Sequence, residues 1–257
     1  MINNLKIDDD IATFTFKDDD YSVLNAIRRV IVGGYIRCVA IDNVSILKNN
    51  TTDLNETELS HKFEAIRIKQ KVPEGTLFTL DKTNNTDNNI LVYYGDIIAT
   101  YENKKINDVI IYPNAYFVAL GPGQSIKITG EAKSGCVHDG GHSGYLSTGS
   151  FGYTIEKKCS LQFHEQFTYG QIMKAATNIL KDFLDQVLSL VKNDDPIEIP
   201  NTIDIGVVYA IRAELIRTYP DLFVILNKPD DKYVLSLGVK KQYDYIKNAC
   251  ITIKGKL

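Results

Sequence analysis

Four stretches of the chain repeat apolar residues at the spacing of an amphipathic helix. They cover residues 22–32, 169–191, 205–217 and 240–253. An apolar stripe is removed from water only when another element covers it, so we expect the four helices to pack against one another. The residues expected to make this packing are Val23, Ile27, Ile31, Ile172, Ala176, Ile179, Phe183, Val187, Ile211, Leu215, Ile246 and Cys250.

The first of these stretches returns later in the chain. The segment S-V-L-N-A-I-R at residues 22–28 lines up with G-V-V-Y-A-I-R at residues 206–212, 184 positions further on. Ala, Ile, Arg and an apolar pair keep the same offsets. Ser22 can cap the first helix, and Gly33 with Gly34 can end it. The pattern indicates two related helices, although seven residues alone do not establish an internal duplication.

Between the helices, shorter runs alternate apolar and polar residues as β-strands do. Such runs occupy 11–16, 35–47, 125–129 and 153–163 in the first part of the chain, and 197–199, 222–227 and 232–237 in the last part. The sequence therefore predicts an α+β protein built from mixed sheets and packed helices.

Residues 193–196, N-D-D-P, end the long helix and are the best linker candidate. We expect residues 1–48 and 156–193 to form one domain of mixed sheets and packed helices. Residues 49–155 are then an inserted β-rich subdomain, and residues 197–257 form a small second α+β lobe.

Composition narrows the function classes. The chain has 257 residues, of which 44% are apolar, and this is enough to bury a substantial core. The net charge of -3 argues against a broad nucleic-acid surface, so we expect DNA only as an indirect partner. No apolar run approaches the roughly 20 residues that span a bilayer, and no secretory signal opens the chain. We expect an intracellular protein with no membrane partner.

The four cysteines lie far apart in sequence and form no C-x-x-C pair. We therefore expect buried free thiols rather than a disulfide framework. A zinc site is conceivable on ligand type alone from Cys136, His138, His142 and Cys159. Cys-x-His is an awkward first pair, however, and the Gly/Ser tract that follows offers nothing rigid. We expect a polar loop and no cofactor, while a Cys/His metal-dependent enzyme remains the alternative.

Three segments resemble the alpha-like (third-largest) subunits of multisubunit DNA-directed RNA polymerases. L-N-A-I-R-R at 24–29 resembles the N-A-L-R-R helix of that family. N-T-T-x-L-x-E-x-x-L-S-H-K at 50–62 resembles its N-T-S-x-L-x-D-E-x-x-A-H-R signature, in the family's order and at about its spacing. L-G-P-G-Q at 120–124 resembles its L-x-P-G-Q strand entry. The cysteine-rich metal loop that the family often carries is absent, and G-G-H-S at 140–143 replaces its H-A-K-W.

The last sixty residues follow the order strand, helix, hairpin and helix. This order resembles the small eleventh-type subunit that pairs with the alpha-like subunit, although the H-T-L-G-N motif of that subunit is not visible. The two resemblances together imply a fusion of both partners in one chain. The implied fold is the alpha-like dimerisation fold, present as an intramolecular pseudo-dimer and not as a homodimer.

The function that this resemblance implies is a non-catalytic assembly platform for transcription. It would hold the second-largest and largest polymerase subunits, with small zinc-bearing subunits as further partners. No catalytic residue is implied, because the family keeps its metal-binding carboxylates on the largest subunit. The positions that match the family's docking segments are Asn25, Arg28, Arg29, Asn50, Thr51, Thr52, His61 and Lys62.

The fusion, the missing cysteine loop and the usage rich in Asn, Ile, Lys, Asp and Tyr resemble the polymerases of large cytoplasmic DNA viruses. This implies a location in the cytoplasm or virion, or in the nucleus if the protein is cellular. An interaction module unrelated to transcription is the remaining alternative.

Overall fold

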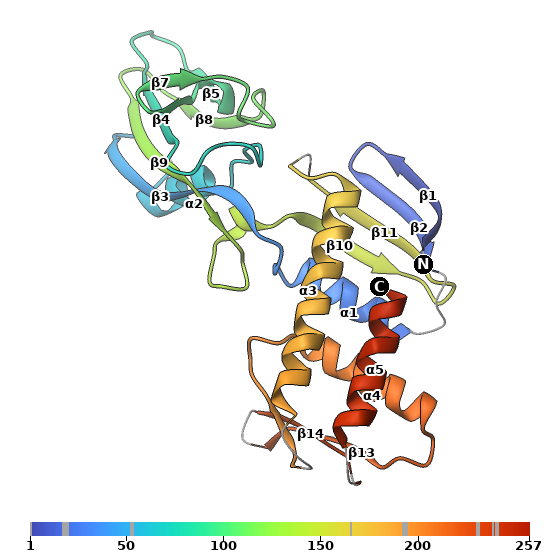
Figure 1. The fold of residues 1–257 in the computed structure, drawn as a ribbon. Helices are drawn as coiled ribbons and strands as arrows, with labels where there is room; N and C mark the ends of the chain where they lie inside the picture. The colour runs from blue at the N-terminus through green and yellow to red at the C-terminus, as the bar shows by residue number, and fades with distance from the viewer. Residues whose placement is uncertain are drawn as a thin grey trace. The chain divides into compact units, whose positions relative to one another are not determined.

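The computed structural model describes residues 2–16, 21–51, 54–164, 166–191, 195–229, 232–237, 239 and 242–257. It is an α+β protein in which all paired strands of these residues are antiparallel. The chain forms two compact units (Figure 1). The helical unit comprises Met1–Ile36, Thr148–Phe163 and Tyr169–Leu257, and the inserted unit comprises Arg37–Ser147 and His164–Thr168.

The first half of the helical unit contains a four-stranded sheet of order β1-β2-β11-β10. Its elements are β1 (Ile2–Asp8), β2 (Ile11–Phe16), α1 (Tyr21–Val32), β10 (Thr148–Tyr153), β11 (Lys158–Phe163) and α3 (Tyr169–Leu190). Along β2, Ala12, Phe14 and Phe16 are buried while Ile11 and Thr13 are exposed, which is the alternation expected for a sheet with one covered face.

The second half of the helical unit begins with β12 (Ile197–Ile199) and α4 (Ile205–Thr218). It continues through β13 (Val224–Asn227), β14 (Tyr233–Leu237) and α5 (Gln242–Lys256). The three strands form a sheet of order β12-β14-β13. The strand, helix, hairpin and helix predicted for this segment are therefore all present.

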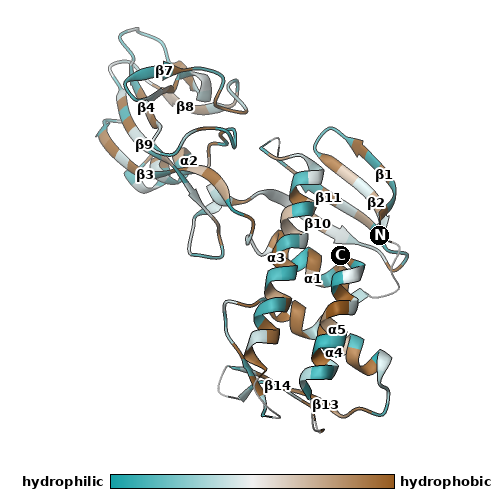
Figure 2. Cartoon of the chain, viewed as in Figure 1, coloured by the Kyte–Doolittle hydropathy of each residue, from teal (hydrophilic) through white to brown (hydrophobic). Residues whose placement is uncertain are grey.

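The four long helices form one core across the two halves. Helix α1 packs on α3 and α4, and α5 packs on α3 and α4, so each helix of the first half contacts a helix of the second half. Figure 2 shows apolar and polar residues on different sides of these helices. All the residues assigned to this packing from the sequence are buried, with the exception of Ile179.

The apolar face of α3 differs from the predicted one. Ile179 is only half-buried, whereas Leu180 is 2% exposed and Met173 and Leu184 are also buried. The prediction followed steps of four and three along the helix and took in Ile179. In the structure α3 contacts α1, α4 and α5, so its buried face is wider and is centred on different residues.

Ion pairs also join these helices. Glu214 of α4 is 2% exposed, and its carboxylate lies 2.6 Å from Nζ of Lys256 on α5 and pairs with Arg217 as well. Lys254 of α5 forms an ion pair with Asp185 of α3. A buried carboxylate is tolerated only when cations and donors surround it, so Glu214 also constrains where α5 ends.

The boundaries of the two units differ from the predicted ones. Strand β3 (Cys38–Asn49) pairs along its length with β9 (Ser125–Gly135), so the inserted unit begins at residue 37 and not at 49. Thr148 already belongs to β10 in the sheet of the helical unit, so the long segment of the inserted unit ends at Ser147 and not at residue 155. Residues 197–257 group with the first-half helices rather than apart from them.

The inserted unit is built on a five-stranded sheet of order β3-β9-β4-β6-β7 and a β5-β8 ribbon. Its remaining elements are α2 (Glu56–Glu64), β4 (Leu77–Thr83), β5 (Ile90–Tyr93), β6 (Ile98–Tyr101), β7 (Lys104–Ile106) and β8 (Tyr116–Leu120). Helix α2 starts with a capping box between Asn55 and Glu58 and packs Leu59 and Phe63 into the core. Within the described residues, no helix combines the length and the apolar character needed to cross a membrane.

The wider face of α3 leads to a stability prediction. Leu180→Ala should lower the free energy of unfolding by about 2–4 kcal/mol, because it empties a packed site. The neighbouring Ile179→Ala should cost about 1 kcal/mol, because that side chain is only half-buried. Urea unfolding of the two variants measures the difference. A larger loss for Ile179→Ala would contradict the observed face.

Candidate protein-docking site

Helix α1 has one buried and one outward face. The outward face carries Asn25, Arg28 and Arg29, which are partly exposed, and Val32, which is 42% exposed. The residues of the buried face are Val23, Leu24, Ala26, Ile27, Val30 and Ile31. The outward positions are spaced three and four apart, so they form one continuous surface of the helix.

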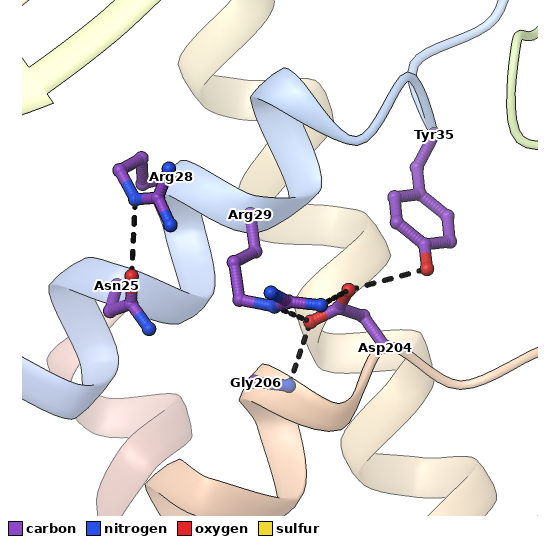
Figure 3. A network of polar contacts seen from close by, with 6 residues as sticks. All are labelled: Asn25, Arg28, Arg29, Tyr35, Asp204 and Gly206. Atoms are coloured by element: carbon purple, nitrogen blue, oxygen red, sulfur yellow. Dashed lines mark hydrogen bonds and ion pairs between the residues drawn. The ribbon is translucent and has the colours of Figure 1, made fainter.

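Arg29 forms an ion pair with Asp204 of the same chain (Figure 3). Its Nε lies 2.8 Å from Oδ1 of Asp204, and its second terminal nitrogen lies 3.0 Å from Oδ2. Such a bidentate pair is directional and stronger than a single hydrogen bond. The hydrogen bond to Asp204 raises the pKa of the Arg29 guanidinium. Arg29 was expected to dock a partner, and in the structure its guanidinium joins α1 to the start of α4.

Asp204 is the centre of this contact. Its side chain is 6% exposed, and Oδ1 also accepts the backbone N–H of Gly206 at 2.7 Å, so the residue is the N-cap of α4. The hydroxyl of Tyr35 donates to Oδ2 at 3.3 Å. One carboxylate therefore begins α4 and holds both α1 and the segment that follows it.

Arg28 has a different environment from its neighbour. Its Nε donates to Oδ1 of Asn25 at 3.1 Å, one turn earlier on the same helix. Within the part of the chain that the structure describes, no carboxylate pairs with Arg28. It borders a surface hollow of about 300 Å³. The lining residues are Arg28, Arg29, Val32, Gly33, Tyr35 and Asp204.

The second group of predicted docking residues lies in the inserted unit. Asn50 donates to the carbonyl of Gly123 at 3.3 Å and accepts from the backbone of Ser125. The hydroxyl of Thr51 donates to Oδ1 of Asn49 at 2.7 Å. These contacts hold the loop between β3 and α2, so both side chains have a local structural task. Thr52 lies outside the described residues.

His61 and Lys62 are exposed on α2. Nζ of Lys62 donates to the carbonyl of Phe117 at 3.1 Å and lies 5.9 Å from the centre of the Tyr116 ring. The predicted docking residues thus fall into two groups. Asn25, Arg28 and Arg29 belong to the helical unit, and the others belong to the inserted unit.

The candidate zinc ligands are not brought together as a site. Nδ1 of His142 accepts the backbone N–H of Gly144 at 3.0 Å, and His138 faces Asp139 at 3.6 Å. Among the residues described, no group of three or more His, Cys, Asp or Glu side chains converges on a point that could hold a metal.

The prediction of buried free thiols is confirmed for all four cysteines. Burial raises the pKa of Cys136, and it raises the pKa of Cys159 to about 11. A pKa raised in this way favours the neutral thiol over the thiolate, and the thiolate is the nucleophilic form.

No protein-family model matches the chain, and no curated protein matches it either.

Sequence reasoning missed Asp204, the residue with the most polar contacts at the site. A signal was present, because an Asp before an apolar helical run is a common N-cap. What could not be read from the sequence is the pairing with Arg29, which lies 175 positions away. That pairing depends on the packing of α1 against α4.

The Asp204 contact predicts a loss of stability on mutation. Asp204→Ala should lower the free energy of unfolding by about 1–3 kcal/mol, because it removes a helix cap and leaves donors without an acceptor. The matched control is Glu156→Ala, which breaks the exposed pair with Lys158 and should change stability little. Chemical unfolding of both variants is the measurement. Equal effects would show that the Asp204 contact is no stronger than a surface ion pair.

The dispersed ligands lead to a prediction about metal. Zinc analysis of the purified chain should find no stoichiometric metal, and EDTA should leave the unfolding midpoint unchanged. Structural zinc contributes directly to folding, so its removal would lower the midpoint. One zinc per chain, lost together with stability, would contradict the prediction.

Proposed function

We propose that this chain is a non-catalytic assembly subunit of a DNA-directed RNA polymerase. Its alpha-like half and its eleventh-type half pair within one polypeptide and hold the two large catalytic subunits. The motifs at 24–29 and 50–62 suggest this function. The packing of the first-half helices α1 and α3 on the second-half helices α4 and α5 is the arrangement that such a pseudo-dimer requires, and it supports the proposal.

The covalent link explains why this arrangement is favourable. Two separate chains that associate lose translational and rotational freedom, at a cost of about 4–15 kcal/mol. When both halves belong to one chain, they do not lose separate translational and rotational freedom on pairing. The ordering of the two halves is then part of the free energy of folding. The helix faces that would otherwise meet between two chains are then paired within one.

The observation that carries the docking proposal is the state of Arg28. Arg28 is partly exposed, so guanidinium donors that find no acceptor within the chain are open to a partner. Asn25 satisfies one of them, and no internal carboxylate meets the others within the described residues. Arg28, the adjacent hollow and the exposed Val32 therefore suit a partner that brings a carboxylate or backbone carbonyls.

The rest of the proposal follows from the resemblance. The second-largest subunit would dock on α1 and α2, the largest subunit and small zinc-bearing subunits would complete the assembly, and DNA would be contacted only through them. The polymerase chemistry would lie on the largest subunit. A large DNA virus is the proposed source, with assembly in the cytoplasm or the virion.

The test is co-purification from cells that produce the chain with its natural partners. The tagged chain should recover two much larger chains in equal amounts, and Arg28→Glu should reduce the recovery of at least one of them, because it reverses the charge at the contact. Lys247→Glu on the outer side of α5 is the control and should recover both. A wild-type chain that recovers no large partner would refute the function, and unchanged recovery by Arg28→Glu would refute the role of Arg28.

A further inference from the structure

Helices α1 and α4, which repeat a short sequence pattern, also bury equivalent positions. The buried residues of α4, apart from Gly206 at its start, are Val207, Val208, Ala210, Ile211, Glu214 and Leu215. Each stands 184 positions after a buried residue of α1. Two helices that bury the same positions over more than two turns also turn the same positions outward.

The outward face of α4 therefore corresponds to the outward face of α1. Tyr209, Arg212 and Ile216 take the places of Asn25, Arg28 and Val32, counted from the same origin. Tyr209 is 45% exposed and Ile216 is 43% exposed, two turns apart on one side of the helix. Arg212 lies between them. This set of three residues is here called the α4 face.

Arg212 is less satisfied than Arg28. Its Nε is buried and has no hydrogen-bond partner. On α1 the equivalent nitrogen donates to Asn25, but on α4 the position of that asparagine holds Tyr209. No carboxylate in the described ranges pairs with Arg212 either. A buried donor of a charged group without an acceptor is rare in folded proteins and calls for an explanation.

We propose that the α4 face is a second protein-docking surface, and that its occupant is a partner segment that presents a carboxylate between apolar side chains. The carboxylate meets the guanidinium of Arg212, and the apolar side chains cover Tyr209 and Ile216. Tyrosine and arginine are the residues that most often dominate binding energy at interfaces. The inference extends the proposed function, because it assigns a second partner to a helix that the family motifs did not mark.

Two other occupants fit less well. Nucleic acid binds through several cations along a phosphate backbone, whereas this face has one arginine between two apolar side chains. A second copy of the chain, bound symmetrically, would place Arg212 near its own copy, and α4 offers no exposed carboxylate to meet it, since Glu214 is buried. A partner with its own acidic residue is the occupant that the charges favour.

The experiment uses single cysteines as reporters, because the four natural cysteines are buried and an introduced surface thiol is more accessible to a label. Tyr209→Cys and Ile216→Cys are placed on the α4 face, and Tyr243→Cys, 43% exposed on α5, is the matched control. Each full-length variant is labelled with a maleimide twice, once purified alone and once in the assembly isolated from cells that supply its natural partners.

All three introduced thiols should react readily in the chain alone. In the assembly, labelling at 209 and 216 should slow by about tenfold or more, because side chains at the centre of an interface are fully desolvated, while labelling at 243 stays the same. Adding Arg212→Glu to the Ile216→Cys chain should restore labelling, and Arg212→Lys should restore it only in part. Equal labelling at 209, 216 and 243 in both samples would overturn the inference.

The outcome separates this inference from the proposed function. Protection at 209 and 216 by a partner that is not a polymerase subunit would leave the α4 face standing and remove the proposed function. Recovery of two large polymerase chains with both thiols still reactive would support the proposed function and rule out the α4 face as a docking surface. If Arg212→Glu failed to fold, the single-cysteine variants would still decide, because they keep Arg212.

Discussion

The contact between α1 and α4 is the interaction on which the helical unit depends. Each of these helices is too short to bury its apolar face alone, and each covers the other. The carboxylate of Asp204 ties the two together at one point, because it caps α4 and binds Arg29 of α1 in the same geometry. The apolar faces supply most of the favourable free energy, since burial is not directional. The polar contact supplies direction, so the helices meet in one arrangement.

The two adjacent arginines of α1 belong to one motif but make different contacts. Neighbouring residues on a helix point about 100° apart, so Arg28 and Arg29 face different surroundings although they share a sequence context. Both line the same hollow, but Arg29 meets a carboxylate from its own chain, whereas Arg28 donates only to the amide oxygen of Asn25 within the described residues. The internal pair also restrains the helix from which Arg28 projects, and a restrained donor loses less freedom when a partner binds.

The features that could be predicted from the sequence are those that depend on local periodicity. The four helices, the hairpins and nearly all of the packing residues follow from apolar spacing, and the buried state of the cysteines follows from their isolation in the chain. Ile179 is only half-buried, and periodicity alone could not place the centre of a helix face that contacts three other helices. The unit boundary at residue 37 was missed because β3 is held by a strand almost ninety positions later, and strand pairing between distant segments leaves no local trace. The Arg29 contact was missed for the same reason.

The joining of both helix pairs in one polypeptide has a consequence for the symmetry of any larger assembly. A pair of identical chains presents two equal faces, and a partner can bind either one, so the first binding event has to break the symmetry. In this chain the face of α1 and the face of α4 carry different side chains and are made in a fixed order on a single ribosome. Each finished molecule therefore carries one α1 face and one different α4 face, and these two faces are distinct before the molecule meets any other protein.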